Sequence, residues 1–334
     1  MAAPKTNTMT TPDHITTLAR DVGAGDRRAL ARAITLVESG RADHRADAMA
    51  LLDLVEGRRQ ALRIGLSGTP GVGKSTFIEA FGLMLTKAGH RVAVLAVDPS
   101  SARSGGSILG DKTRMDLLAR DPNAFIRPSP SQTQLGGVAR RTREAVALCE
   151  AAGYDIVLIE TVGVGQSETV VAQMSDLFLL LLAPAGGDEL QGVKRGIMEI
   201  ADMILVNKAD GDLQSQAIRT CADYAGALRL MRKRPQDPDG FPKALTVSAL
   251  ESDGIDDAWD QMQALTNWRR ETDVWQRNRA DQARYWFAEE VRLQLLARIA
   301  LDPVLGDRMI KLEKDVAAGR MSPTAAAAAA LADQ

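Results

Sequence analysis

The sequence predicts an α/β fold: a doubly wound, mostly parallel sheet with helical extensions at both ends. Between residues 61 and 265, short and nearly continuous apolar runs alternate with amphipathic helical stretches. Strands buried on both faces of a parallel sheet have such unbroken runs, and their alternation with helices is typical of doubly wound domains. The expected strands are Leu62–Ser67, Val92–Asp98, Ile156–Glu160, Leu177–Ala183, Met203–Asn207 and Ala244–Ser248.

Helical segments are expected on both sides of this domain. In residues 1–60 apolar positions recur at helical spacing, and scattered glycines divide them into two or three helices. In residues 266–334 the strand patterns stop, and Ser322 and Pro323 predict the start of a final helix as N-cap and first helical residue. The apolar stripe of this C-terminal segment either packs back on its own domain or joins a second copy of the chain.

The composition is that of an ordinary globular protein and excludes several functional classes. The chain has 334 residues with a formal net charge of -2, so nothing indicates a global surface for nucleic acid. Cys149 and Cys221 are far apart and fit buried thiols in a reducing compartment. The longest apolar run, Leu177–Ala183, is too short to span a membrane, and no signal peptide is visible. A cytoplasmic protein is expected.

A glycine-rich loop follows the first expected strand and opens a helix over Thr76–Ala88. Its residues are Gly68, Thr69, Pro70, Gly71, Val72, Gly73, Lys74, Ser75 and Thr76. Glycines let successive backbone N–H groups point at phosphate oxygens, and the start of the helix adds its positive dipole end. Lys74 is expected to reach the β- and γ-phosphates, and the Ser75 hydroxyl to ligate Mg²⁺. The order strand, loop, helix argues against a chance glycine-rich turn.

A second motif, Asn207-Lys208-Ala209-Asp210, predicts a loop that recognises guanine. It ends an expected strand, and ligands bind at the carboxyl ends of parallel strands. The Asp210 carboxylate can accept hydrogen bonds from guanine N1–H and the 2-amino group, a pair that adenine does not offer. Asn207 can bond the other edge of the base, and the stem of Lys208 can lie along the ring. The loop expected to close over the base follows the next strand: Ser248, Ala249 and Leu250.

Three acidic residues are candidates for Mg²⁺ and for hydrolysis. Asp98 and Glu160 each end an expected strand, and Asp111 follows a glycine-rich stretch. Oxygen ligands on strand ends suit a magnesium ion that keeps several of its waters. Each acid alone is equally well explained as a solvated loop charge or a helix cap, and the shared position at strand ends favours Asp98 and Glu160 over Asp111.

Gly163 is expected to sense the γ-phosphate through its backbone N–H. Many GTPases place a water-orienting Gln directly after this glycine, but here Val164 follows it, and Gln166 lies further along. Intrinsic GTP hydrolysis is therefore expected to be slow, with a partner completing the site.

With these motifs, the chain resembles the metallochaperone-type P-loop GTPases, and within them the methylmalonyl-CoA mutase-associated GTPases (MeaB/ArgK-like). Glu160, where other GTPases more often have Asp, is itself a mark of the metallochaperone group. The stretches that carry the resemblance are Val97–Ser101, Gly105-Gly106, Leu109–Met115, Leu135–Ala139, Glu160–Glu168, Gly187–Lys194, Gly196–Asp202 and Asn207–Asp210.

The resemblance implies a partner and a purpose. Family members bind adenosylcobalamin-dependent methylmalonyl-CoA mutase, gate the loading of intact cofactor and protect or restore the enzyme, with GTP hydrolysis as the switch. It also implies a homodimer joined through the C-terminal helices, and roles for Asp98, Asp111 and Glu160 in Mg²⁺ binding and hydrolysis. Residues 186–194 resemble an extra mobile switch of the family.

Other functions on the same fold stay open at this point. A nickel-insertion GTPase needs Cys or His ligands, and the few histidines and cysteines form no cluster in the sequence. A P-loop kinase that acts on a small metabolite has little need of a guanine-recognising loop. A scaffold that senses GTP without hydrolysing it is a further alternative.

Overall fold

The computed structural model describes residues 12–55, 57, 59–97, 115–128, 135–161, 167–184 and 195–332. Contacts divide the chain into two compact units, one ending at Arg279 and the other beginning at Ala280. The first holds the sheet, and each unit is described by itself. The domain boundaries expected at residues 60 and 265 remain predictions.

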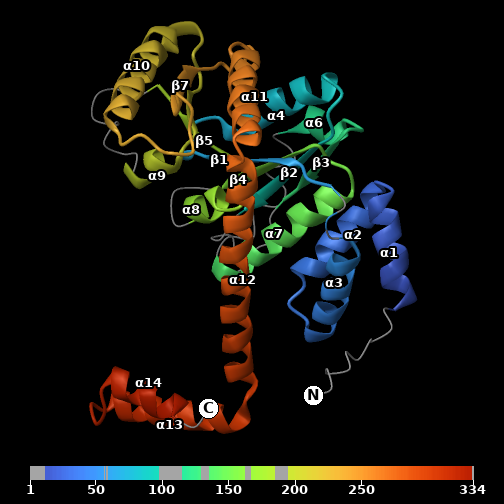
Figure 1. Ribbon diagram of the computed structural model, residues 1–334, viewed down its shortest axis with the longest axis vertical. Helices are drawn as coiled ribbons and strands as arrows, with labels where there is room; N and C mark the ends of the chain where they lie inside the picture. Colours follow the sequence, from blue (N-terminus) through green and yellow to red (C-terminus); the bar gives the residue numbers. More distant parts are fainter. Residues whose placement is uncertain are drawn as a thin grey trace. The chain divides into compact units, whose positions relative to one another are not determined.

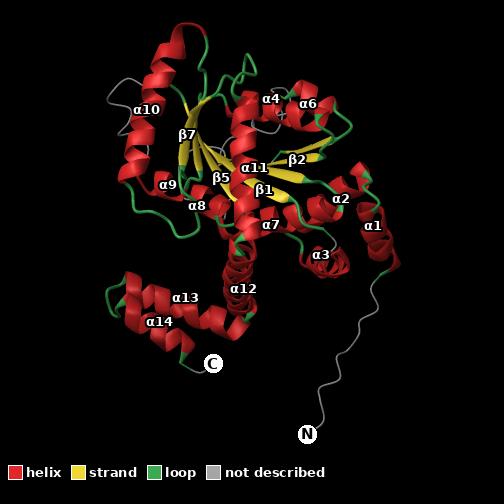
Figure 2. Cartoon of the chain, turned by 45° about the horizontal axis from the view of Figure 1, so that its top comes forward, coloured by secondary structure: helices red, strands yellow, loops and turns green. Residues whose placement is uncertain are grey.

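The core of the first unit is a seven-stranded sheet in the order β3-β2-β4-β1-β5-β6-β7 (Figure 2). Every strand pair is parallel, which confirms the predicted doubly wound α/β fold. The strand β3, at one edge, was not predicted: only three apolar residues, 124–126, precede Arg127 and Pro128, too few to stand out as an apolar run. The strands are β1 (Leu62–Ser67), β2 (Val92–Val97), β3 (Ala124–Arg127), β4 (Ile156–Thr161), β5 (Leu177–Leu182), β6 (Met203–Val206) and β7 (Lys243–Thr246).

Helices cover both faces of the sheet (Figure 2). On one face α4 and α11 pack together over Ile64 and Leu66 of β1, and on the other α7 contacts β2 and β4 while α8 contacts β1 and β5. The alternation of residues along β1 explains this, because successive side chains point to opposite faces. The helices are α4 (Lys74–Lys87), α6 (Asp116–Arg120), α7 (Leu135–Ala151), α8 (Ser167–Ala172), α9 (Arg195–Ile200), α10 (Gln214–Leu230) and α11 (Ile255–Glu271).

The N-terminal segment forms three helices, α1 (Asp13–Gly23), α2 (Arg27–Glu38) and α3 (Ala42–Val55), which pack against α7 (Figure 1). Their apolar positions are buried as the helical spacing predicts, from Ile15 in α1 to Leu51 in α3. A buried ion pair adds to the contact, since Arg45 donates to Glu144 of α7 at 2.6 Å.

Buried ion pairs join α11 and the start of α12 (Val274–Leu301) to the amino end of the sheet. Arg269, with 3% of its surface exposed, donates to Asp202 at 2.6 Å and to Asp237 at 2.8 Å. Arg279 donates to Asp176 at 2.5 and 2.6 Å. Asp176 and Asp202 directly precede β5 and β6, so each arginine holds a helix to the beginning of a strand.

The Asp202 carboxylate is ionised in this setting. Burial by itself would raise its pKa, but the guanidinium groups of Arg269 and Arg234 outweigh burial, and the pKa lies below its ordinary value. Arg234 lies 2.9 Å from Asp202 and adds the second cation. The network therefore keeps its charges paired inside the protein.

The second unit continues α12 from Ala280 and adds α13 (Pro303–Ala317) and α14 (Pro323–Leu331). The predicted cap is confirmed: Ser322 Oγ accepts from Ala325 N at 3.2 Å, and Pro323 opens α14. Within the described ranges, no helix combines the length and the apolar composition that crossing a bilayer requires.

Candidate nucleotide-binding site

The glycine-rich loop lies at the carboxyl end of β1, where its backbone needs glycine. Gly71 and Gly73 have φ of 85° and 89°, in the left-handed region that side chains disfavour. A Cβ on Gly73 would also lie 2.7 Å from Asn207 Nδ2. The loop therefore has a shape that only this glycine pattern permits, with Asn207 directly against it.

The helix after the loop starts without a side-chain cap. Helix α4 begins at Lys74, two residues before the expected start, and its N-cap Gly73 supplies no side-chain hydrogen bond. The first N–H groups of a helix have no partner within the helix, and with the dipole they attract an anion. Ser75 lies in this first turn. The donor set fits a nucleotide phosphate, and the Ser75 hydroxyl fits Mg²⁺ beside it.

The Lys74 ammonium folds back over the loop. Its Nζ donates to the carbonyl of Gly68 at 2.7 Å and to that of Thr69 at 3.4 Å. These acceptors belong to the loop itself, so the cation lies against the glycine-rich loop. The predicted contact of Lys74 with phosphate remains a prediction.

Asn207 joins the two motifs. It is 1% exposed, its Nδ2 donates to the carbonyl of Val72 at 2.9 Å, and its Oδ1 accepts from Ala249 N at 3.0 Å. One amide thus links the phosphate loop, the guanine motif and the loop after β7. Sequence reasoning assigned Asn207 to the base alone, and it missed this bridge because the partners lie 135 and 42 residues away in the chain.

Lys208 makes a second link to the phosphate loop. It has a φ of 62°, rare for a residue with a side chain, and its Nζ donates to the carbonyl of Gly71 at 2.8 Å. The stem of Lys208 therefore stretches between the two motifs, as a side chain lying along a bound base would.

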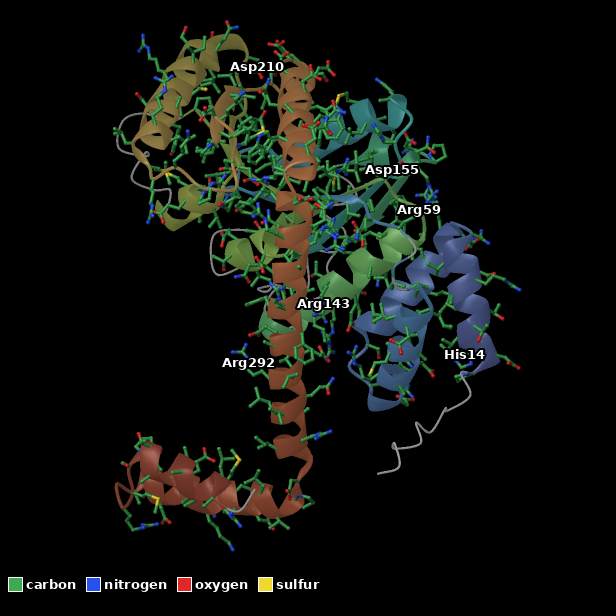
Figure 3. The ribbon with its side chains drawn as sticks, viewed as in Figure 1. His14, Arg59, Arg143, Asp155, Asp210 and Arg292 are labelled. Atoms are coloured by element: carbon green, nitrogen blue, oxygen red, sulfur yellow. The ribbon has the colours of Figure 1, made fainter. Side chains whose placement is uncertain are left out.

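Asp210, labelled in Figure 3, is positioned by Ser248 of the loop after β7. Ser248 Oγ donates to Asp210 Oδ2 at 2.5 Å, and the same hydroxyl accepts from Glu251 N at 3.1 Å. Ala249 is buried, whereas Leu250 is 78% exposed and marks the outer end of the loop. The second carboxylate oxygen of Asp210 makes no hydrogen bond among the described residues, so it is available to a ligand.

Of the predicted metal and catalytic acids, only Glu160 is in the described part of the chain. Glu160 is the penultimate residue of β4, which ends at Thr161 and not at Glu160 as expected. It is paired in register with Leu66 of β1 and Ala96 of β2, which places it beside the strand that enters the phosphate loop. It is 5% exposed. Asp98, Asp111, Gly163 and residues 186–194 lie outside the described residues.

Comparison with known proteins agrees with this geometry. The family model "Methylmalonyl Co-A mutase-associated GTPase MeaB" matches residues 30–303. A "Putative GTPase" of Caulobacter vibrioides is 54% identical over 305 residues, covering 91% of this chain and 93% of its own. The mouse "Methylmalonic aciduria type A homolog, mitochondrial" is 49% identical, covering 91% of this chain and 75% of its own.

Of two further relatives, one is named a GTPase and the other a kinase. "GTPase ArgK" of Escherichia coli is 49% identical and covers 85% of this chain and 86% of its own. A crystal structure named "LAO/AO transport system kinase" has a TM-score of 0.75 at 36% identity and covers 97% of this chain and 98% of its own. The family match spans most of the chain. The P-loop and the guanine motif of the chain lie together at the carboxyl end of the sheet. The chain therefore belongs to the methylmalonyl-CoA mutase-associated GTPases and is a P-loop GTPase.

Proposed function

We propose that this GTPase binds an adenosylcobalamin-dependent methylmalonyl-CoA mutase, gates the loading of intact cofactor and protects or restores the mutase. The observation that carries the proposal is the built connection between the two motifs, in which Asn207 and Lys208 bond the phosphate loop. Through these bonds, a change in the phosphate loop on hydrolysis would alter the positions of the base-binding loops. The family match supplies the partner.

In the proposed site, backbone N–H groups of residues 71–75 and Lys74 hold the phosphates of GTP. Ser75, Asp98, Asp111 and Glu160 would hold Mg²⁺, which when bound offsets the charge that develops on the phosphoryl group. Asp210 selects guanine by accepting two hydrogen bonds. Gly163 reports the γ-phosphate through its backbone N–H.

Hydrolysis in this site is slow until a partner acts. The residue after Gly163 is Val164, whose side chain offers no hydrogen bond to the attacking water. The mutase, bound to the GTP state, would complete the arrangement around the water and be released or reset on hydrolysis.

The second unit serves in this proposal as a dimer arm. Apolar side chains remain exposed on α12 and α13, among them Phe287 at 72%, Leu295 at 53% and Val304 at 70%. Surfaces of this kind favour association, and a second copy would cover them symmetrically. Phe287→Arg should shift the protein from dimer to monomer in sedimentation velocity, whereas Gln276→Arg, on an exposed polar position of the same helix, should not.

The rival proposal on this fold is a kinase, a name carried by the structural relative. A kinase needs an acceptor molecule beside the γ-phosphate, whereas a GTPase passes the phosphoryl group to water. The guanine motif favours the GTPase, because phosphoryl transfer itself does not require a particular base.

Single-turnover hydrolysis of GTP tests the function. The purified protein should release phosphate slowly, and a methylmalonyl-CoA mutase should accelerate the release and co-elute with the protein when a non-hydrolysable GTP analogue is present. Lys74→Ala should abolish both effects while the protein stays folded. Absence of phosphate release with and without the mutase would leave only a GTP-sensing scaffold, and absence of co-elution would refute the mutase partnership.

A further inference from the structure

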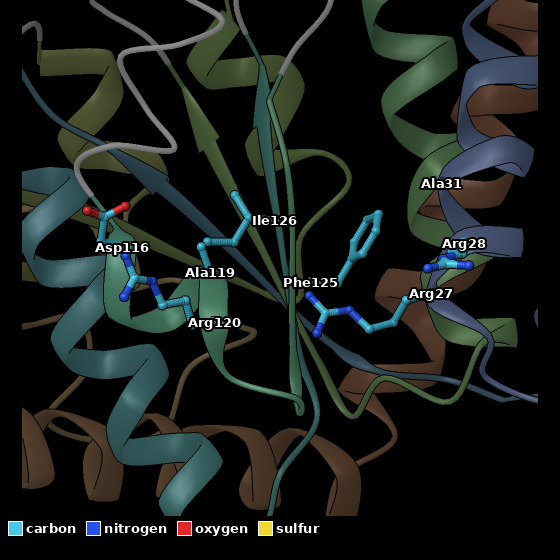
Figure 4. Close-up of a pocket in the computed structure, with 8 residues that line it drawn as sticks. All are labelled: Arg27, Arg28, Ala31, Asp116, Ala119, Arg120, Phe125 and Ile126. Carbon is cyan, nitrogen blue, oxygen red and sulfur yellow. The ribbon is translucent and has the colours of Figure 1, made fainter.

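A hollow of about 330 Å³ lies beside the edge strand β3 (Figure 4). Strands β2 and β4 separate β3 from β1, the strand that enters the phosphate loop. One wall is α2, with Arg27, Arg28 and Ala31, and the other is α6, with Asp116 and Arg120. Between them lie Phe125 and Ile126 of β3. Figure 4 shows these two side chains leaving the strand toward opposite walls, as expected of neighbours on a strand.

The backbone of β3 is open toward this hollow. In the order of the described sheet, β3 has β2 on one side and no strand on the other. Val92 N donates to the carbonyl of Asn123, which directs Asn123 and every second residue after it toward β2. Ala124 and Ile126 therefore direct their backbone groups away from β2; Ala124 N donates to the carbonyl of Asp121 at 3.2 Å, which leaves the carbonyl of Ala124 and the N–H and carbonyl of Ile126 for a ligand. An edge of this kind is a template for one more strand.

The walls of the hollow are positively charged. Three arginines face one carboxylate, that of Asp116. Arg27 donates to the carbonyl of Asp121 at 3.2 Å, just before β3. Arg28 and Arg120 are exposed and form no ion pair or hydrogen bond with any described residue. Guanidinium groups bind carboxylates in a bidentate manner, so two unneutralised arginines on opposite walls favour an acidic ligand.

We propose that this β3 edge groove binds an extended acidic segment of a partner protein, which adds a strand to the sheet. Main-chain groups of the segment pair with the carbonyl of Ala124 and with the N–H and carbonyl of Ile126. Its alternate side chains reach the walls, where acidic residues meet Arg28 and Arg120. Strand addition of this kind takes affinity from the main chain and specificity from the side chains. The proposal does not depend on the function assigned to the nucleotide site.

A simpler role must be separated from this one. Charged residues on an edge strand can serve only to keep copies of a protein from pairing through their edges. In that case the arginines would repel other edges without selecting a ligand. A ligand-binding groove instead enriches acidic sequences and depends on the backbone of what it binds.

The test selects peptides from a random dodecapeptide library on the full-length protein, with counter-selection on Arg28→Glu/Arg120→Glu. Both positions are exposed, so this variant should fold and bind GTP normally. Arg229→Glu/Arg232→Glu, two exposed arginines at the end of α10 and just beyond it, changes the net charge equally and is the matched control. We expect enriched peptides to carry alternating Asp or Glu and to bind the first variant at least 10-fold more weakly, with the control unchanged.

Two readouts report strand pairing itself. N-methylation of the best peptide at alternate positions should abolish binding in one register and leave it unchanged in the other. The amide of Ile126 should become protected from hydrogen exchange when the peptide binds. The proposal is wrong if no acidic peptide is enriched, if both double variants bind equally, or if N-methylation is tolerated in both registers.

Discussion

The two ends of the parallel sheet use similar residues in opposite ways. At the amino end, Asp176 and Asp202 are buried and bonded to arginines from α11 and α12. At the carboxyl end, Asp210 is partly exposed and keeps one oxygen without a hydrogen bond in the described structure, while Ser248 holds the other. The carboxylates at the amino end are hydrogen-bonded to arginines and hold helices to the sheet. A carboxylate oxygen without a hydrogen bond can instead accept one from a ligand.

The difference shows that the position of a carboxylate at the end of a strand does not by itself determine its role. Acids lie at both ends of these strands, and only their partners separate the roles. Removing the cation that pairs with a buried acid lowers the stability of the fold. Replacing an acid that has no internal partner is expected to weaken ligand binding instead. Four substitutions test this contrast.

Arg269→Ala should have the largest effect. It leaves Asp202 and Asp237 buried with one of their cations removed, and breaking a buried ion pair typically costs about 3–5 kcal/mol. The free energy of unfolding in urea should fall by about that amount. Arg20→Ala, which removes an exposed pair with Asp21, should lower it by less than about 1 kcal/mol. Equal losses in both variants would remove the distinction between the buried network and a surface pair.

Asp210→Asn should affect binding rather than stability. The amide replaces a pair of acceptors by one acceptor and one donor, and charge-assisted hydrogen bonds are worth about 1.5–3 kcal/mol, so GTP affinity should fall about 10- to 100-fold. Xanthosine triphosphate should then bind better than GTP, because its 2-oxo group accepts from the new amide. Isothermal titration measures both, with exposed Asp212→Asn as control. Unchanged GTP affinity would refute the guanine assignment.

The amino end should also respond to acid. The pKa of Asp202 is lower in the folded protein than in the unfolded chain, so its contribution to stability is present above its ordinary pKa of about 3.9 and is lost as the pH falls through the folded value. The stability gap between wild type and Asp202→Asn should therefore narrow below about pH 4, by at most about 1.4 kcal/mol per pH unit. Urea midpoints from pH 3 to 7 measure the gap. A gap that widens in acid would show that Asp202 is not held as a carboxylate.

Ser248→Ala should have the smallest effect. It removes the hydrogen bond to Asp210, worth about 1 kcal/mol, and should weaken GTP binding about 5-fold. The variant also removes the acceptor of Glu251 N, so stability should fall by about 1 kcal/mol. Ser215→Ala, on the exposed side of α10, is the control for a titration with GTP. A loss as large as that of Asp210→Asn would mean that Ser248 contacts the nucleotide itself.

Most of the sheet could be predicted from the sequence because its strands are buried on both faces. Short unbroken apolar runs such as Leu177–Leu182 are typical of such strands, and their alternation with helical patterns distinguishes them from buried helix segments. The edge strand β3 was not predicted, because its three apolar residues are followed by Arg127 and Pro128 and form too short an apolar run. Its place in the sheet comes from pairing with β2, which lies about thirty residues earlier.

The phosphate loop and the guanine motif were also visible in the sequence, because each consists of consecutive residues whose chemistry needs that order. Glycines with positive φ and a lysine at the start of a helix belong to one local structure. The bridge made by Asn207 to Val72 and Ala249 was not visible, since nothing local to Asn207 specifies partners so distant in the chain.

The sequence by itself thus determined the parallel α/β fold, the phosphate loop, the guanine motif and the family. Only the tertiary structure decided which acids are paired with arginines, which of the described acids keep an oxygen for a ligand, and which strand lies at the edge of the described sheet. The physical reason is range: backbone propensity, apolar periodicity and motif chemistry act over a few residues. Ion pairs such as that of Arg279 with Asp176, 103 residues apart, exist only after the chain has folded.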